Sequence, residues 1–355
     1  MKGDDHVVPG TGGRTEPGTR EPGTSEPARP GALKVIVLDV DGAVIRQPRL
    51  MAQYQPTVVR LQEKSEALRY WCRVEELEGL RQLMAATVGS VKGAVIFYGS
   101  GDYHHLAWLG ISLMDEPLTV IHFDNHCDFW RTPRRAYTHF GHWVVQVLKL
   151  PHVRRLIQLG IDGDFDLSKE TPFPMGRIGQ VMGPLLRGEV ETYPNAMAYS
   201  TLLGRISGTL PGVEFEPGLF TTRATWKNMR DHGGIEATLE RVLPTLPTEA
   251  VYLTIDKDCL READNFAAYP GRQGTLRLDE VLAAIALIAK RKRIVAADVC
   301  GDGSPFAGRA RSLKSLVARL EAGEIPAAAF SSPENLELNE KANLQILERL
   351  AKAQA

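Results

Sequence analysis

Two segments of the sequence place carboxylates and imidazoles at alternate positions directly after a short apolar run. The first segment carries Asp124, His126 and Asp128, and the second carries Asp256 and Asp258. In an extended chain alternate side chains point the same way, so each set converges at the end of its strand. Buried carboxylates are costly without a compensating cation, and mixed oxygen and nitrogen ligands suit manganese or a similar divalent ion. The pattern therefore predicts a site for two divalent cations.

A glycine turn earlier in the chain supplies histidine to the same site. This turn leads from an apolar run to His104 and His105, either of which can be a ligand, and we favour His104. A single Asp-x-Asp after a strand is more often a turn or a helix cap than a ligand pair. A pair of adjacent histidines often lies on the surface. Three such segments in one chain nevertheless make coincidence the weaker explanation.

The apolar runs also predict the strands that position these residues. Short β-branched runs predict buried strands at residues 33–40, 94–98, 118–123, 156–161, 251–255 and 294–299. Helical patterns lie between several of them, including residues 58–87 and 278–289. This alternation predicts an α/β fold with a mostly parallel sheet, whose carboxyl edge would hold the ligands. Residues 165–225, rich in Pro and Gly, are expected to form irregular insertions that shape substrate access.

The composition argues against a nucleic-acid-binding or membrane protein. A formal net charge of -1 over 355 residues is unlike a domain that grips phosphate backbones. The one dense basic cluster, residues 290–293, closes a helical pattern, where cations are favourable. No run of about 18 apolar residues and no secretory signal occurs. Four widely spaced cysteines fit a reducing compartment. We expect a cytoplasmic protein that binds neither nucleic acid nor membranes.

The chain is expected to consist of a tail and one catalytic domain. Residues 1–31 carry a ragged Glu-Pro-Gly-Thr repeat and too few apolar side chains to offset the entropy of ordering. We predict a disordered tail over residues 1–31. A single domain over residues 32–355 follows, because α/β domains of roughly 250 to 300 residues are ordinary.

The three ligand-bearing segments resemble those of the arginase or ureohydrolase superfamily. That family carries Gly-Gly-Asp-His, then Asp-x-His-x-Asp, then Asp-x-Asp, and the resemblance spans residues 94–305. It implies an arginase-like domain, built as three layers (α/β/α), with about two Mn²⁺ ions per chain. By the family pattern, Asp124 and Asp256 would bridge both ions. Asp128 and the first-motif histidine would complete one ion, and His126 and Asp258 the other. Family members often form homo-oligomers.

The sequence departs from the family pattern in ways that bear on the substrate. Tyr103 separates the first-motif Asp102 from His104. Arginases place a substrate-holding glutamate near the end of the last strand, where this chain offers Asp302, which is shorter and shifted. The motif Phe-Asp-Asn-His-Cys-Asp is more similar to that of a divergent branch of the family. This branch includes peptide arginases, which convert arginine side chains of peptide precursors to ornithine. The resemblance therefore implies an arginine-containing peptide or a small guanidino compound as substrate.

The chemistry implied is metal-assisted hydrolysis of a guanidino group with release of urea. Divalent cations lower the pKa of water and so supply a nucleophile near neutral pH. The leaving amine needs a proton, a task suited to histidine. His139 and His142 lie about where the family carries its catalytic histidine, and either one is a candidate. A packed or capping histidine is the competing interpretation for both.

Three other functions compete with this hypothesis. Asp39 and Asp41 in Leu-Asp-Val-Asp-Gly resemble the nucleophile motif of haloacid-dehalogenase phosphatases, although the two residues can equally well end a strand in a turn. That alternative leaves the histidine-bearing segments unexplained. A small-molecule ureohydrolase, similar to agmatinase or formiminoglutamase, uses the same metal site on a different substrate. A non-catalytic binding protein on this scaffold is the third alternative. The intact ligand motifs argue against it, because such a protein would be free to lose its carboxylates.

Overall fold

The structure is a computed structural model, and it describes a defined part of the chain. The described residues are 33–129, 134–162, 188–197, 199–203, 205, 209–210, 213–267, 273–305, 312–314 and 325–354. Contacts divide the chain into Met1–Ala32 and Leu33–Ala355, and only the second unit contains described residues. The tail predicted over residues 1–31 lies outside the described residues.

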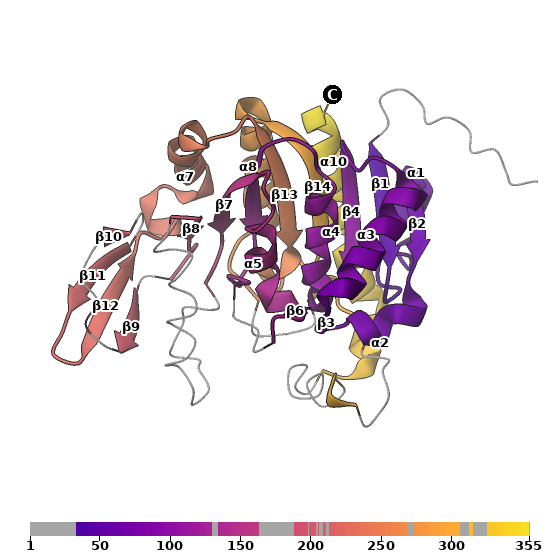
Figure 1. The fold of residues 1–355 in the computed structure, drawn as a ribbon, viewed down its shortest axis with the longest axis horizontal. Helices are drawn as coiled ribbons and strands as arrows, with labels where there is room; N and C mark the ends of the chain where they lie inside the picture. The colour runs from indigo at the N-terminus through magenta and orange to yellow at the C-terminus, as the bar shows by residue number, and fades with distance from the viewer. Residues whose placement is uncertain are drawn as a thin grey trace, which may run out of the picture. The chain divides into compact units, whose positions relative to one another are not determined.

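A parallel eight-stranded sheet forms the centre of the second unit (Figure 1), in the order β2-β1-β4-β14-β13-β5-β7-β8. Every neighbouring pair in it is parallel. Its strands are β1 (Lys34–Asp39), β2 (Thr57–Arg60), β4 (Ala94–Gly99), β5 (Leu118–Phe123), β7 (Val153–Leu159), β8 (Val190–Tyr193), β13 (Ala250–Asp256) and β14 (Arg293–Cys300). The predicted α/β fold class and the six predicted strands of this sheet are confirmed.

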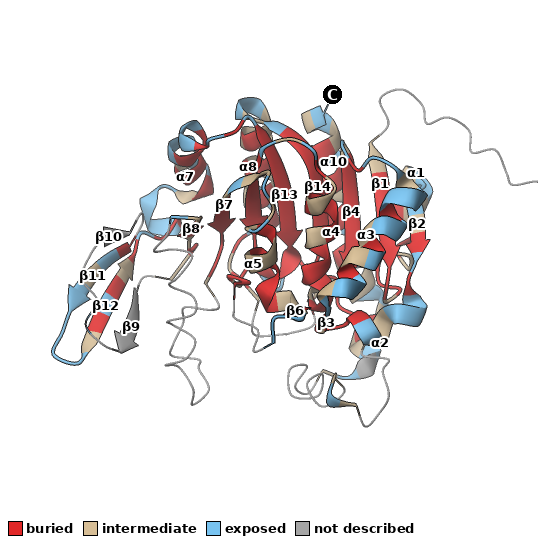
Figure 2. Cartoon of the chain, viewed as in Figure 1, coloured by how far each residue is buried: buried red, intermediate tan, exposed pale blue. Residues whose placement is uncertain are grey.

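Helices cover both faces of the sheet and bury two separate apolar layers. One layer includes side chains of α3 (Val74–Val88), α4 (Ala107–Ser112) and α5 (Trp143–Val147). The other includes side chains of α7 (Gly234–Val242), α8 (Leu278–Arg291) and α10 (Pro333–Gln354). Alternate residues of a strand serve opposite layers, as on β4, where Ile96 lies in the first layer and Val95 in the second. Figure 2 shows the strands buried and the outer helix faces exposed.

The predicted helix over residues 58–87 is wrong in its first half. That stretch contains β2, the 3-10 turn η1 (Gln62–Lys64), the short helix α2 (Ser65–Leu68) and β3 (Trp71–Arg73) before α3 begins. The β-branched Val58 and Val59 pair with β1, and the sheet overrides the helical tendency of the charged residues that follow. Tyr70 has a φ of 65°, a left-handed conformation that interrupts any helix there.

Part of the stretch predicted to be irregular forms a second sheet. Residues 165–225 contain β8 and an antiparallel sheet of order β10-β11-β12-β9. Its strands are β9 (Tyr199–Leu203), β10 (Thr209–Leu210), β11 (Val213–Pro217) and β12 (Thr221–Trp226). On β12 buried side chains alternate with more exposed ones, which is the two-residue period of a strand. The prediction from Pro and Gly content did not take this period into account. Residues 163–187 lie outside the described residues.

Short elements complete the described part of the chain. They are β6 (Tyr137–His139), which pairs with β3, the helix α1 (Pro48–Tyr54), and the 3-10 helices η2 (Gly101–Leu106), η3 (Phe140–His142), η5 (Arg230–His232), η6 (Leu243–Thr245), η7 (Lys257–Cys259) and η8 (Ala327–Ser331). Within the described residues, none of the helices combines the length and apolarity needed to cross a bilayer.

Candidate metal centre

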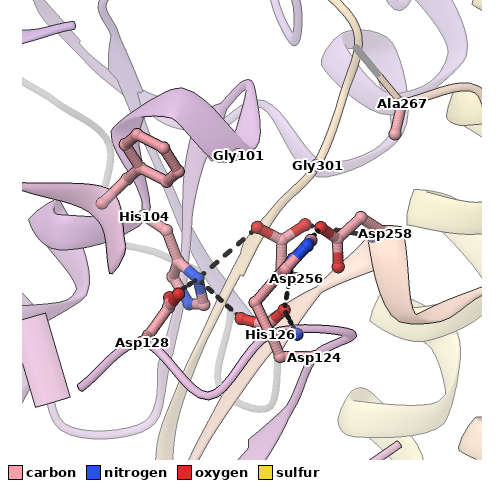
Figure 3. A pocket seen from close by; sticks show the side chains of 10 residues that line it. Gly101, His104, Asp124, His126, Asp128, Asp256, Asp258, Ala267 and Gly301 are labelled. Atoms are coloured by element: carbon pink, nitrogen blue, oxygen red, sulfur yellow. Dashed lines mark hydrogen bonds and ion pairs between the residues drawn. The ribbon is translucent and has the colours of Figure 1, made fainter. Parts of the chain in front are cut away.

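Side chains from the ends of three strands of the central sheet converge on one pocket (Figure 3). Asp124, His126 and Asp128 follow β5, Asp256 ends β13, Asp258 lies in η7 directly after it, and His104 comes from η2, after β4. The pocket is lined by Gly101, His104, Asp124, His126, Asp128, Phe140, Asp256, Asp258, Ala267 and Gly301. Its volume of about 30 Å³ exceeds the roughly 10 to 15 Å³ that a cavity needs to hold one water molecule. The structure thus brings together six of the residues predicted as ligands.

His104 shows most clearly that the pocket suits a cation. Its buried Nδ1 makes no hydrogen bond within the described part of the chain. Three carboxylate oxygens, the Oδ2 atoms of Asp124, Asp128 and Asp256, lie 3.2, 3.1 and 3.4 Å from this nitrogen. Ligands held at about 2.1 Å from an octahedral ion lie about 3 Å apart. Each of the three oxygens is therefore separated from Nδ1 as two ligands of one ion would be.

The neighbours of His104 decide which ring nitrogen is available. Nε2 lies 3.0 Å from the hydroxyl of Thr254, and that hydroxyl donates its single proton to Asp298 at 2.7 Å. The hydroxyl must therefore accept from Nε2–H, which leaves the lone pair on Nδ1 facing the carboxylates. Burial lowers the pKa of His104, but Cys300, Asp124 and Asp128 raise that pKa well above its usual value. A proton and a cation therefore compete for Nδ1.

A second cluster lies on the other side of Asp124. His126 Nδ1 is 2.9 Å from Asp258 Oδ2 and 3.6 Å from Asp124 Oδ1. Asp124 thus turns Oδ2 toward His104 and Oδ1 toward His126, which places it between two groups of donors. The side chain of His126 is 34% exposed, whereas that of His104 is 1% exposed. The pocket therefore opens to solvent on its His126 side.

Three of the four acids that line the pocket are short of compensating positive charge. Burial, and then the charge of Asp124, raises the pKa of Asp128 to about 8. Burial and the neighbouring carboxylates likewise raise the pKa values of Asp256 and Asp258 to about 7. Carboxylates whose pKa is raised in this way are stabilised in their charged form by a nearby cation. The donor set fits divalent cations that prefer oxygen and nitrogen ligands.

Local backbone geometry supports these positions. The first Asp of each motif accepts the backbone N–H two residues on, so Asp124 and Asp256 also cap their own turns. Asp128 has a left-handed φ of 52°, and its Oδ2 accepts from Trp143 Nε1 at 2.5 Å. A Cβ on Gly101 would lie 2.7 Å from an Asp256 carboxylate oxygen. Glycine at that position is therefore what lets the backbone pass beside Asp256.

The other predicted site residues do not line the pocket. His105 is fully buried away from it, and its pKa falls to about 3 because of burial and then of Lys314. His139 and His142 flank the pocket residue Phe140 in sequence, and their rings stack with centroids 5.5 Å apart. Burial, followed by the nearby His142, lowers the pKa of His139 to about 4. Their catalytic role remains a prediction.

Asp302 was expected to hold the substrate, and the structure gives its carboxylate other partners. It lies in the buried interior and does not line the pocket. Its Oδ1 accepts from Lys257 Nζ at 2.8 Å, and Gln47 and Asn343 donate to the same carboxylate. Asp39, the nucleophile of the phosphatase alternative, accepts from the backbone N–H of Gly42, as a residue in a turn does.

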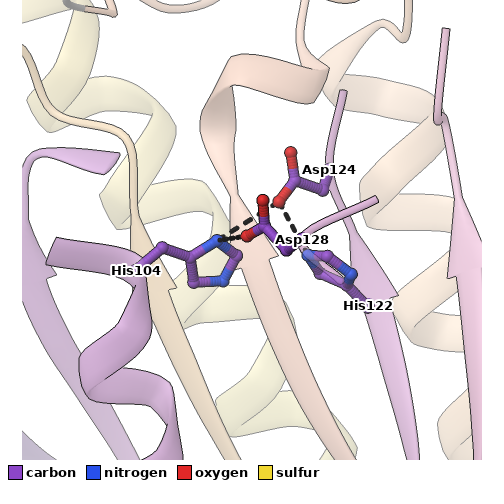
Figure 4. A group of neighbouring side chains, drawn as sticks. All are labelled: His104, His122, Asp124 and Asp128. Carbon is purple, nitrogen blue, oxygen red and sulfur yellow. Dashed lines mark hydrogen bonds and ion pairs between the residues drawn. The ribbon is translucent and has the colours of Figure 1, made fainter. Parts of the chain in front are cut away.

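Several residues around the site were missed in the sequence. His122 Nε2 lies 2.7 Å from Asp124 Oδ2, and His104, His122, Asp124 and Asp128 form one group of potential metal donors (Figure 4). The Cys300 thiol donates to Asp256 Oδ2 at 3.2 Å. The spacing that selected Asp124 also selects His122, because alternate residues of a strand share a face. No comparable pattern marks Cys300.

Comparisons with known proteins agree with this architecture. An uncharacterized protein of Thermotoga maritima is 21% identical, over 76% of this chain and 80% of its own length. Among solved structures, proclavaminate amidino hydrolase from Streptomyces clavuligerus has a TM-score of 0.53 and 13% identity, covering 90% of this chain and 92% of its own. The chain has an arginase-like fold.

Two further structures have the same fold. A putative agmatinase from Clostridium difficile gives a TM-score of 0.52 at 13% identity, with 90% of this chain and 97% of that one covered. A hypothetical agmatinase from Burkholderia thailandensis gives 0.51 at 16% identity, with 90% and 87% covered. No protein-family model matches the sequence. At sequence identities this low, the comparisons show the arginase-like fold alone.

Proposed function

We propose that this chain is a binuclear-metal hydrolase that cleaves a guanidino group and releases urea, with arginine side chains of a peptide precursor as its substrate and ornithine as its product. The observation that carries the proposal is the buried Nδ1 of His104, which faces three carboxylate oxygens at 3.1 to 3.4 Å without a hydrogen bond to any described residue. The shared fold adds support, because structures that have it are named as an amidino hydrolase and as agmatinases.

The proposed ligands fall into two groups that share carboxylates. His104 and Asp128 would hold one ion, and His126 and Asp258 the other. Asp124 and Asp256 would serve both, which for Asp124 agrees with its two oxygens facing opposite ways. When bound, about two Mn²⁺ ions would lower the pKa of water and so supply a nucleophile near neutral pH.

Other residues of the pocket would prepare the reaction. Phe140 and Ala267 give it apolar surface against which a substrate can exclude water. The exposed side of His126 leaves a path by which a side chain of a larger substrate can enter. His139 has a pKa of about 4 and is neutral near pH 7, so it would accept a proton there rather than donate one. His142 is buried and, like His139, lies outside the pocket lining, so both histidines stay candidates to protonate the leaving amine.

The setting of Asp302 supports a second candidate function. A guanidinium cation is usually held by a carboxylate, and Asp302 is already paired with the buried Lys257. Among the described residues that line the pocket, each carboxylate belongs to the proposed ligand set. This favours a small molecule whose scissile group is an amide or a formimino group, which presents fewer N–H donors than a guanidinium does, as for a formiminoglutamase-like enzyme.

One comparison separates the two candidates. The manganese-loaded protein is incubated with an arginine-containing peptide, free arginine, agmatine and a formimino compound, and urea, formamide and bound metal are measured on one sample. Urea from the peptide alone supports the proposal, and formamide from the formimino compound alone supports the second candidate. Bound metal with neither product would contradict both. Asp39→Ala is the matched control, because it removes a carboxylate at the end of β1 that lies outside the ligand set.

A further inference from the structure

A row of polar side chains crosses the central sheet directly beneath the metal ligands. Thr192 on β8, Gln158 on β7, His122 on β5, Thr254 on β13 and Asp298 on β14 are register partners of one another, strand by strand. We call these five residues the polar row. All five are buried, with exposures of 2% or less. Buried polar groups are costly unless they are hydrogen-bonded, so the contacts within the row need an explanation.

The first half of the polar row fixes the protonation of His122. Thr192 donates to Gln158 Oε1 at 2.8 Å, and Gln158 Nε2 donates to the carbonyl of Cys127 at 2.7 Å. A carbonyl only accepts, so the amide nitrogen must be the atom on that side. The same Nε2 lies 3.1 Å from His122 Nδ1 and donates its second N–H there, so Nδ1 accepts. The ring proton then sits on Nε2 and is donated to Asp124 Oδ2 at 2.7 Å.

These hydrogen bonds give His122 a different role from the ligands that surround it. By position alone His122 could be a ligand, because its ring nitrogen lies within 4.8 Å of donor atoms of His104, Asp124 and Asp128. A ligating Nε2 would need its proton on Nδ1, where it would face the N–H of Gln158 at 3.1 Å. Two donors facing each other in a buried site are unfavourable. His122 is therefore a hydrogen-bond donor to a ligand.

The second half of the polar row orients His104. Asp298 accepts from Thr254, which in turn accepts from His104 Nε2, and this chain of bonds turns Nδ1 toward the pocket. Trp143 packs against both imidazoles, with ring centroids 4.8 Å from His104 and 5.0 Å from His122. The two histidines are thus fixed by hydrogen bonds on one side and by packing on the other.

We propose that the polar row is a positioning device that sets one oxygen of Asp124 and one nitrogen of His104 toward the same ion, with His122 as a donor and not a ligand. The inference rests on the proposed metal centre. Partners that orient metal ligands typically contribute about 10- to 100-fold in metal affinity. Gln158→Leu removes the residue that fixes the His122 ring without touching a ligand, and should weaken metal binding by that factor.

The matched control lies on the same strand. Thr119 is fully buried on β5, and its hydroxyl pairs with Thr248. Thr119→Val removes a buried hydrogen bond of similar kind outside the ligand set, and should change metal affinity less than about 2-fold if only the polar row matters. The affinity is measured with Co²⁺ alone, by competition with a chelator. Equal affinities for the wild type and Gln158→Leu would overturn the proposal.

A second measurement tests the row in the wild-type protein. Nitrogen-15 NMR of the full chain reports which ring nitrogen of each histidine carries the proton, and His122→Phe assigns the His122 signal. We expect His122 to be protonated on Nε2 both in metal-free protein and after Zn²⁺ is added. Loss of that proton on adding Zn²⁺ would make His122 a ligand and overturn the proposal. If no metal binds, the proposed function fails, while the tautomer in the metal-free protein still decides the arrangement of the polar row.

Discussion

Replacing Lys257 by methionine should destabilise the protein and leave its substrate binding nearly unchanged. The ammonium of Lys257 and the carboxylate of Asp302 are 2.8 Å apart, with side chains 0% and 2% exposed. Methionine fills a similar volume and removes the charge, so Asp302 keeps only the amide donors of Gln47 and Asn343. Breaking one partner of a buried pair typically costs 3 to 5 kcal/mol, and the two amides place the expected loss at about 3 kcal/mol.

The partner variant separates a structural role for Asp302 from a substrate-binding role. If Asp302 serves to neutralise Lys257, Asp302→Asn should cost a similar free energy of unfolding and leave KM within about 2-fold of wild type. The double variant should then cost less than the sum of the single variants, with a coupling of about 2 kcal/mol. A residue that holds the substrate would instead raise KM at little cost in stability.

Urea unfolding of the metal-free single and double variants, followed by circular dichroism, gives the free energies. KM is measured on whichever substrate the activity comparison identifies. The reasoning is refuted if Asp302→Asn unfolds like the wild type and raises KM by 10-fold or more (about 1.4 kcal/mol of binding). In that case Asp302 would hold substrate as the sequence comparison suggested.

Two further predictions concern pH and packing. The pKa of His139 falls from 6.5 to about 4 on folding, so the unfolded chain binds more protons between these values. Lowering the pH from about 7 to 5 should therefore cost the wild type about 1 to 2 kcal/mol more free energy of unfolding than it costs His139→Gln. Urea unfolding of both proteins at both pH values measures this difference. An equal loss in the two proteins would contradict the prediction. Gly101→Ala places a Cβ 2.7 Å from Asp256 and should weaken Co²⁺ binding more than 10-fold, whereas Gly79→Ala, whose Cβ meets nothing within 4 Å, should not change it. Unchanged binding by Gly101→Ala would show that Asp256 is free to shift.

The parts of the site that depend on local geometry could be predicted from sequence. Asp124, His126 and Asp128 converge because alternate residues share one face of an extended chain, and parallel strands bring their carboxyl ends to one edge. His122 obeys the same spacing, but it lies inside the strand, where a sequence pattern cannot separate a core residue from a functional one. Only the register with β7, which places Gln158 beside it, shows what its ring does.

The parts that depend on distant partners could not be predicted. Asp302 lies shortly after the last strand of the sequence, as expected. Its carboxylate pairs with the buried Lys257, and no spacing rule relates the two residues. Trp143 reaches Asp128 from a helix whose direction depends on packing. In the same way, charged residues between 58 and 73 favoured a helix, and pairing of β2 with β1 prevailed because tertiary contacts outweigh propensity.

The measurement that tests the account most directly is metal content of the purified chain after equilibration with Mn²⁺ and removal of the excess. We predict about two ions per chain for the wild type, about one for Asp258→Ala, and none for Asp124→Ala, because Asp124 contacts both groups of donors. Asp39→Ala should bind as the wild type does. Absence of bound metal in the wild type, or full metal content in Asp124→Ala, would contradict the central claim that this edge of the sheet is a binuclear metal site.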